Sequence, residues 1–303
     1  MTDTTPDAAP RIALRHRLEY RLFRGVKALL RTLSPARVRR FGHGLGRLGY
    51  RLLAGRRRLA LANLRLALPE LGPEEHQRIT RACFEHFGAT FCEIATADRF
   101  SPEDLVARFD ITGWEHVDEA MARGRGAFLM TGHFGAWELM IYPLGKRLGE
   151  FHAVARPPNN PLVERDLRRI RQRFGVDLVD KKGAGHRMLN ILRRRAAVGI
   201  VIDQRIRQGG ILVPFFGQPS LTSPVVAYLS LLRQVPVVPG FCYPVGADRF
   251  EVRFDPPIEP EGKLPGPDNE AELTRRYLQA VEDEVRRRPE LWLWMHRRWQ
   301  LER

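Results

Sequence analysis

The chain has 303 residues, which is enough for one large domain or two small ones with a core that needs no covalent staples. Apolar residues make up 44% and charged residues 28% of the sequence, a balance that excludes a disordered chain. The three cysteines (Cys83, Cys92 and Cys242) form no CxxC pair and have no metal-ligand spacing. We therefore expect no disulfide framework, no bound metal and a reducing compartment.

The positive charge is concentrated near the N-terminus. The formal net charge is +15, and residues 11–60 contain 15 Arg or Lys residues against one acid, Glu19. No run approaches the roughly 18 to 20 consecutive apolar residues of a membrane span, and the first ten residues lack the layout of a signal peptide. The sequence therefore predicts a basic segment on a nearly neutral body that is neither secreted nor inserted across a bilayer.

Within the basic segment, apolar residues between Ile12 and Leu33 recur at steps of three and four, which predicts one amphipathic helix. Ser34-Pro35 is typical of the start of a second helix, which is amphipathic and rich in glycine. Such a segment suits an anionic membrane surface, with leucines toward the acyl chains and arginines toward phosphates. Packing on the protein itself and binding to nucleic acid are the alternatives, but no zinc finger, RNP-like strand or bZIP pattern supports the latter.

Short apolar runs alternate with helical patterns after Gly124, and this alternation predicts an α/β fold with a mostly parallel sheet flanked by helices. Ligands of such folds bind at the edge of the sheet formed by the carboxyl ends of its strands. The predicted strands are 127–131, 151–155, 177–180, 197–203, 211–216, 236–243 and 249–255. We divide the chain into a membrane-associating segment, residues 1–56, and an α/β domain, residues 57–303.

His133 leaves the end of the first of these strands, and Glu138 follows five positions later. A carboxylate one turn away can fix the tautomer of a histidine and stabilise its charged form, so that the imidazole takes a proton from a hydroxyl. The spacing alone carries little weight, because nine histidines and 35 acids predict about one such match by chance. A lone histidine at a strand end is at least as often a structural hydrogen-bonding residue, so the weight of this pair comes from the motifs around it.

Further motifs follow in chain order. Arg156-Pro157-Pro158-Asn159-Asn160 and Asp203-Gln204 each end a strand, VPFFG spans residues 213–217, and LWLWMHRRW spans residues 291–299. From Asn63 to Trp299 the chain resembles the lysophospholipid acyltransferase superfamily, and specifically its lipid A lauroyl/myristoyl acyltransferase branch. The resemblance implies a glycerol-phosphate-acyltransferase-like fold. The implied activity is transfer of an acyl chain to a hydroxyl of a phosphorylated glycolipid.

The resemblance also implies roles for single residues. His133 would be the general base, Glu138 its orienting partner, and Arg171 a group near the reaction centre that holds the thioester oxyanion or a phosphate. Arg156, Asn160, Arg173, Asp203 and Gln204 are the substrate-binding candidates. For Arg156 a loop-fixing salt bridge, and for Asp203 a turn-capping carboxylate, remain equally open. We expect Trp292, Trp294, Trp299, His296 and His152 to be structural.

We expect no cofactor and a monomer, with acyl carrier protein or CoA delivering the acyl chain as a thioester. The expected partners are this carrier protein, an anionic phospholipid membrane and a glycolipid acceptor, and the expected location is the cytoplasmic face of an inner membrane. Members of this branch commonly begin with an apolar anchor helix, whereas this chain has a basic amphipathic one, which leaves the acceptor open. The alternatives are another lipid acceptor, such as a lysophospholipid or a phosphatidylinositol mannoside, or a membrane-surface protein without catalysis.

Overall fold

The computed structural model describes residues 12–180, 183–206 and 208–299. The helices are α1 (Leu14–Arg31), α2 (Pro35–Leu52), α3 (Ala54–Ala67), α4 (Pro73–Thr96), α5 (Pro102–Val106), α6 (Trp114–Ala122), α7 (Trp137–Leu148), α8 (Pro161–Gln172), α9 (Ala184–Arg193), α10 (Val225–Arg233) and α11 (Pro267–Arg287), with short 3₁₀ turns η1 (Ala97–Arg99) and η2 (Pro289–Leu291). The strands are β1 (Phe109–Thr112), β2 (Ala127–Thr131), β3 (Phe151–Ala155), β4 (Val176–Asp180), β5 (Ala197–Val201), β6 (Ile211–Phe215), β7 (Gln218–Thr222), β8 (Val237–Pro244) and β9 (Phe250–Phe254).

Seven of the described strands form one sheet in the order β1-β9-β8-β2-β5-β3-β4. Every neighbouring pair is parallel except β8 and β9, so the sheet is mostly parallel, as the sequence predicts. The run 211–216 is not part of this sheet, because β6 pairs with β7 in a separate antiparallel hairpin. The sequence also failed to predict β1 and α6, which precede the region where the alternating pattern becomes clear.

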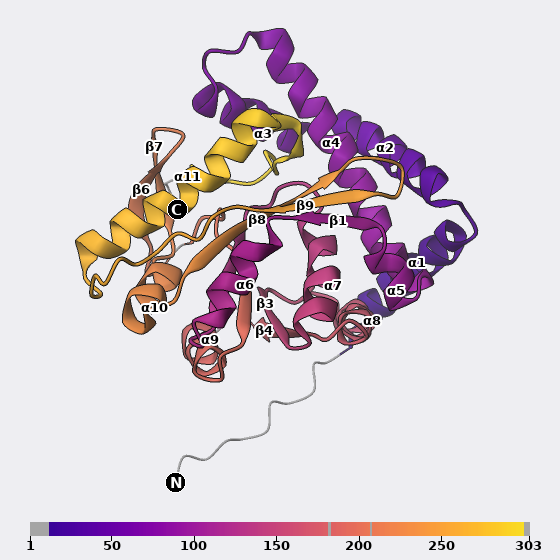
Figure 1. The fold of residues 1–303 in the computed structure, drawn as a ribbon. Helices are drawn as coiled ribbons and strands as arrows, with labels where there is room; N and C mark the ends of the chain where they lie inside the picture. The colour runs from indigo at the N-terminus through magenta and orange to yellow at the C-terminus, as the bar shows by residue number, and fades with distance from the viewer. Residues whose placement is uncertain (1–11, 181–182, 207, 300–303) are drawn as a thin grey trace.

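Helices cover both faces of the sheet (Figure 1). Alternate residues of β2 point to opposite sides, so Ala127 and Leu129 join the core formed with α6 and α7, whereas Phe128 and Met130 join the core formed with α9, α10 and α11. A strand that is buried on both faces contains apolar residues throughout, which is why AFLMT shows no alternation. The fold is thus the α/β sandwich that the sequence predicts.

The N-terminal helices pack against α4 and α8 (Figure 1). Two glycines of α2 permit its close approach to α4, since a Cβ atom at Gly46 would lie 2.2 Å from the carbonyl oxygen of Phe84. The division of the chain at residue 56 stays a prediction, and α3 runs across it. None of the helices in the described ranges is both long enough and apolar enough to cross a membrane.

Candidate active site

Two neighbouring parallel strands bring His133 and Asp203 together. β2 and β5 pair in a register that places Thr131 opposite Val201, and the two polar residues each follow two positions later. Asp203 Oδ1 lies 2.6 Å from His133 Nδ1, and Asp203 Oδ2 accepts a hydrogen bond of 2.7 Å from the backbone N–H of His133. The carboxylate therefore holds both the ring and the backbone of the histidine.

Asp203 is a buried anion with an unusually complete set of donors. Burial by itself raises the pKa of this carboxyl group, but the charge of His133 and the hydrogen bonds from His133 and Trp292 outweigh it and lower the pKa to about 2. The group is therefore ionised at neutral pH. An ionised carboxylate at Nδ1 favours the tautomer with a proton on Nδ1 and stabilises the imidazolium that forms when Nε2 accepts a second proton.

The other ring nitrogen of His133 is directed toward the cavity described below. The side-chain amide of Gln204 lies 2.8 Å from Nε2. Because the ionised Asp203 carboxylate favours the tautomer with its proton on Nδ1, Nε2 of that tautomer accepts a hydrogen bond from this amide. The ring of Trp137 flanks the imidazole at a centroid distance of 5.3 Å. His133 therefore presents a basic nitrogen to any hydroxyl that replaces the Gln204 amide.

Glu138 does not take the position that the sequence predicts for it. The expected partner of the His133 ring was Glu138, but the Nδ1 position is taken by Asp203. Glu138 lies in the first turn of α7 and accepts a hydrogen bond of 3.2 Å from Arg171 of α8. The physical reason is that the His133 ring turns toward the end of the adjacent strand β5, whereas Glu138 faces α8.

Arg171 is buried between two carboxylates, Glu138 at 3.2 Å and Glu164 at 3.8 Å. Its Nη1 atom has no hydrogen-bond partner within the described residues. A buried guanidinium with unused donors is suited to an oxygen anion, because Arg keeps its charge and donates in a fixed fork.

A cavity of about 880 Å³ opens beside His133, between the strand ends and α7. Its polar lining includes Glu138, Arg156, Arg171 and Gln204. Much of the remaining wall is apolar and comes from β2, β3, β5, α7 and α10, including Leu129, Met140, Leu144, Phe151, Ile200 and Val226. A volume and lining of this kind fit a ligand with a long apolar part and a polar end.

The remaining candidates divide between the cavity and the side of α8 that faces α1. Arg156 lines the cavity and donates to Asn159 across 3.2 Å. Asn160 caps the start of α8 and donates to the backbone oxygen of His16 and to Glu19, both on α1. Arg173 donates to the backbone oxygens of Asp98 and Phe100. The structure thus does not bring Asn160 and Arg173 together with His133.

The C-terminal tryptophans do more than pack. Trp292 is buried and donates from Nε1 to Asp203 Oδ2 across 2.7 Å. The backbone of the same segment pairs with the His133 turn, as Gly135 N–H donates to Leu291 and Leu293 N–H donates to His133. Asn63 of α3 in turn donates to the carbonyl oxygens of Trp294 and His296. The motif was visible in the sequence, but its contact with Asp203 joins residues 89 positions apart.

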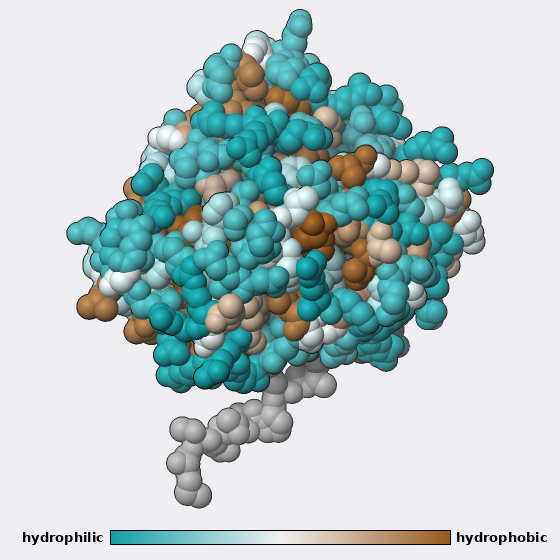
Figure 2. Space-filling view, viewed as in Figure 1, coloured by the Kyte–Doolittle hydropathy of each residue, from teal (hydrophilic) through white to brown (hydrophobic). Residues whose placement is uncertain are grey.

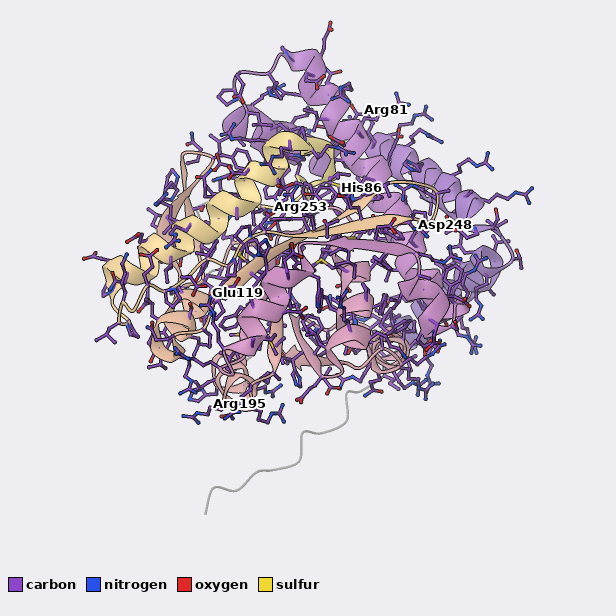
Figure 3. All side chains as sticks on the ribbon, viewed as in Figure 1. Arg81, His86, Glu119, Arg195, Asp248 and Arg253 are labelled. Carbon is purple, nitrogen blue, oxygen red and sulfur yellow. The ribbon has the colours of Figure 1, made fainter. Side chains whose placement is uncertain are left out.

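The turn after His133 requires glycine. Gly135 has φ of +57°, and a Cβ atom there would lie 1.9 Å from the carbonyl oxygen of Cys242. His86 lies where α4 meets the sheet (Figure 3), and its Nε2 atom donates to the carbonyl oxygen of Gly135 across 3.1 Å. The turn is therefore held from β8, from the C-terminal segment and from α4.

His86 predicts a pH dependence of stability. Burial lowers its pKa to about 4, although the hydrogen bond to Gly135 opposes this shift. Because the unfolded state then binds more protons between about pH 6.5 and 4, the free energy of unfolding falls as the pH falls through that window, by about 2 kcal/mol between pH 7 and 5. Urea unfolding of wild type and His86→Asn at both pH values measures this contribution. We expect a smaller decrease in the variant, and an equal decrease in both proteins would contradict the assignment.

Comparison with known proteins gives one consistent result. The chain is 28% identical over 281 residues to the lipid A biosynthesis lauroyltransferase of Escherichia coli (strain K12), covering 90% of this chain and 89% of the relative. It is 26% identical to the palmitoleoyltransferase of the same strain over 85% of this chain and 83% of the relative. It is 24% identical to a phosphatidylinositol mannoside acyltransferase of Mycobacterium tuberculosis (strain ATCC 25618 / H37Rv), over 54% of this chain and 53% of the relative. Residues 11–301 match the bacterial lipid A biosynthesis acyltransferase family, and the chain belongs to that family.

Proposed function

We propose that this acyltransferase moves a fatty acyl chain from a thioester of acyl carrier protein, or of CoA, to a hydroxyl of a lipid A precursor. The observation that supports it most strongly is the Asp203–His133 pair beside a large, partly apolar cavity, in which only the Gln204 amide contacts Nε2 among the described residues. The pair requires no metal or prosthetic group to act as a base.

In the proposed reaction, the acceptor hydroxyl replaces the Gln204 amide at Nε2 of His133. The imidazole takes the hydroxyl proton while the oxygen attacks the thioester carbonyl. The tetrahedral oxyanion then collapses, the C–S bond breaks, and the imidazolium returns its proton to the thiolate. The products are an ester and a free thiol, and no acyl group is attached to the protein. Asp203 stabilises the imidazolium in both steps.

Arg171 is the proposed anion-holding group. Its buried guanidinium lines the same cavity as His133, and its Nη1 atom has no hydrogen-bond partner among the described residues, so it is suited to the thioester oxyanion or to a phosphate of the acceptor. Glu138 holds Arg171 by their hydrogen bond, and we therefore propose that Glu138 orients this arginine. Arg156, which lines the cavity at the end of β3, is the proposed second phosphate contact.

We further propose that α1 attaches the protein to the cytoplasmic face of an anionic membrane. Four leucines of α1 are largely exposed (Leu14, Leu18, Leu22 and Leu29), each by more than half. Arg15, Arg17 and Arg21 of the same helix are also exposed. The face drawn in Figure 2 is mostly hydrophilic, with apolar residues scattered over it. An exposed leucine row flanked by arginines is typical of a helix lying in a lipid interface.

Replacing Leu18 and Leu22 together with Ser is expected to weaken binding to anionic vesicles by about tenfold or more, because each leucine would otherwise bury apolar area in lipid. Both side chains are exposed, so the fold should be unaffected. The matched control is Leu212→Ser with Leu264→Ser, which changes two leucines that are equally exposed elsewhere on the surface. Vesicle sedimentation measures the binding. Equal binding by the two double variants would contradict attachment through α1.

Lipid mass spectrometry tests the proposed reaction and its acceptor. The host should lack its own late acyltransferases and should express wild type or His133→Ala. A lipid A species heavier by one acyl chain, present only with wild type, is expected. If another lipid gains an acyl chain that depends on His133, the proposed reaction stands and the proposed acceptor is wrong. The similarity to a phosphatidylinositol mannoside acyltransferase makes a phosphatidylinositol mannoside the candidate acceptor in that case. No change in any lipid in a host that makes both acceptors would contradict the proposal.

A further inference from the structure

Two motifs to which the proposed reaction assigns no role pack together into one buried aromatic block, VPFFG (213–217) and LWLWMHRRW (291–299). Five rings form this block: Phe215, Phe216, Trp292, Trp294 and Trp299. The ring of Phe215 stacks on Trp299 at a centroid distance of 5.8 Å and meets Trp292 edge-on at 5.6 Å. Within the described residues, none of the five rings belongs to the wall of the His133 cavity. Any effect of the aromatic block on the reaction must therefore pass through a residue of the site.

Trp292 is the member of the block that makes such a contact. Its Nε1–H donates a hydrogen bond of 2.7 Å to Asp203 Oδ2. The neighbouring Trp294 is equally buried but donates to the carbonyl oxygen of Pro289, also across 2.7 Å. Asp203 Oδ2 also accepts the backbone N–H of His133, while Oδ1 faces Nδ1 of the ring. The carboxylate therefore cannot rotate away from the imidazole without breaking the bond to Trp292.

The indole of Trp292 is itself held by the backbone around it. Its carbonyl oxygen accepts a hydrogen bond of 3.1 Å from the thiol of Cys83. Trp292 and Phe134 form an antiparallel β-bridge, and Leu293 N–H donates to the carbonyl oxygen of His133 across 3.1 Å. The segment that carries the indole thus also holds the backbone of the histidine, so that indole, carboxylate and imidazole share one frame.

A donor that binds the carboxylate also changes what the carboxylate does for the ring. A hydrogen bond to an ionised carboxylate takes up part of its negative charge, so less of that charge stabilises the imidazolium. We propose that Trp292 is a positioning residue, whose indole N–H fixes Asp203 against Nδ1 and limits the proton affinity of Nε2 of His133. A base that binds its proton less tightly returns it more readily to the thiolate. This role rests on the proposed function, which makes His133 the base, and goes beyond the structural role that the sequence predicts for Trp292.

Other charged groups lie around the Asp203–His133 pair. Arg298, in the same C-terminal segment as Trp292, is fully buried; burial lowers its pKa to about 10, and the charge of Asp203 opposes this shift. His86 contacts the turn that follows His133. On the side of the cavity the charged groups are Glu138, Arg156, Arg171 and Arg205. Exchanging one aromatic side chain for another leaves all these charges in place, so it isolates the contribution of the indole N–H.

The test compares Trp292→Phe with Trp294→Phe. Each variant removes an indole hydrogen bond from the same buried block and keeps an aromatic ring, but only the bond of Trp292 reaches Asp203. The first readout is the titration of the His133 imidazole, followed by ¹⁵N NMR of the full-length protein. The second is the pH profile of kcat for acyl transfer, together with KM for the acyl donor. Thermal unfolding of both variants controls for folding.

We expect the midpoint of the His133 titration to lie at higher pH in Trp292→Phe than in Trp294→Phe, corresponding to about threefold tighter binding of the proton at Nε2. The acid limb of the kcat profile should move in the same direction. KM for the acyl donor should stay the same, because neither tryptophan lines the described cavity. Equal midpoints in the two variants, or a lower midpoint in Trp292→Phe, would overturn the positioning role.

A measurement on the wild type covers the case in which Trp292→Phe does not fold. The indole N–H resonance of Trp292 should titrate with the same midpoint as His133, whereas that of Trp294 should not, since it bonds to a backbone carbonyl. A Trp292 resonance that stays constant while His133 titrates would refute the proposal. The NMR experiments need no substrate, so a coupled titration without any acyl transfer would reject the proposed function and leave the link between Trp292 and His133 intact.

Discussion

Replacing His133 with Ala is expected to lower kcat for acyl transfer by about 10⁴-fold. General-base catalysis by a positioned side chain contributes about 10² to 10⁴-fold, and the proposed reaction uses the same imidazole to accept the hydroxyl proton and to return it to the thiolate. KM for the acyl donor should change little, because most of the cavity wall is apolar and stays intact. Steady-state kinetics with a purified acyl thioester and acceptor measure both constants.

The variant should fold and bind vesicles as wild type does, since His133 is partly exposed and α1 is unchanged. Thermal unfolding and vesicle sedimentation are the controls. A folded His133→Ala protein with a rate near that of wild type would remove the general-base assignment.

Replacing Asp203 with Asn is expected to lower kcat by about 10³-fold. The Asn side chain keeps an oxygen for the Trp292 N–H but presents an amide N–H to the imidazole. His133 then holds its proton on Nε2, which is the wrong tautomer for a base, and the imidazolium loses its counter-charge. Glu138→Gln is the matched comparison, because Glu138 contacts Arg171 and not Nδ1.

Asp203→Asn and Glu138→Gln should lower kcat in different ways. Asp203→Asn should change the pH profile of kcat, because it acts through the protonation of His133, whereas Glu138→Gln should keep the profile and reduce the rate through Arg171. The account would be contradicted if Glu138→Gln lowered kcat more than Asp203→Asn and if Asp203→Asn kept the wild-type pH profile. Glu138, rather than Asp203, would then be the residue that orients His133.

The fold could be predicted from the sequence wherever local pattern determines it. Buried strands such as AFLMT and the amphipathic repeat of α1 are evident in the order of residues, and the structure confirms them. The short strand β1 was missed because its four residues, FDIT, have no distinctive apolar run. The sequence predicts the run 211–216 as a strand of the main sheet and does not predict β7, because strand pairing depends on contacts that the local pattern does not contain.

The site shows the same limit more clearly. The sequence places His133, Glu138, Arg156 and Gln204 near strand ends, and the structure puts all four around one cavity. The sequence alone does not show which carboxylate contacts Nδ1 of His133, because proximity along the chain favours Glu138. Asp203 is 70 positions away and becomes a neighbour only through the pairing of β2 with β5. Arg171 likewise reaches Glu138 only because α8 packs beside α7.

The most direct measurement of the central claim is the tautomer of His133 by ¹⁵N NMR of the imidazole at neutral pH, with the signal assigned by comparison with His133→Ala. A proton on Nδ1 and an unprotonated Nε2 are the expected result, and the proton should move to Nε2 in Asp203→Asn. A wild-type ring that carries its neutral-state proton on Nε2 would contradict the account, because His133 would then have no base to offer the acceptor hydroxyl.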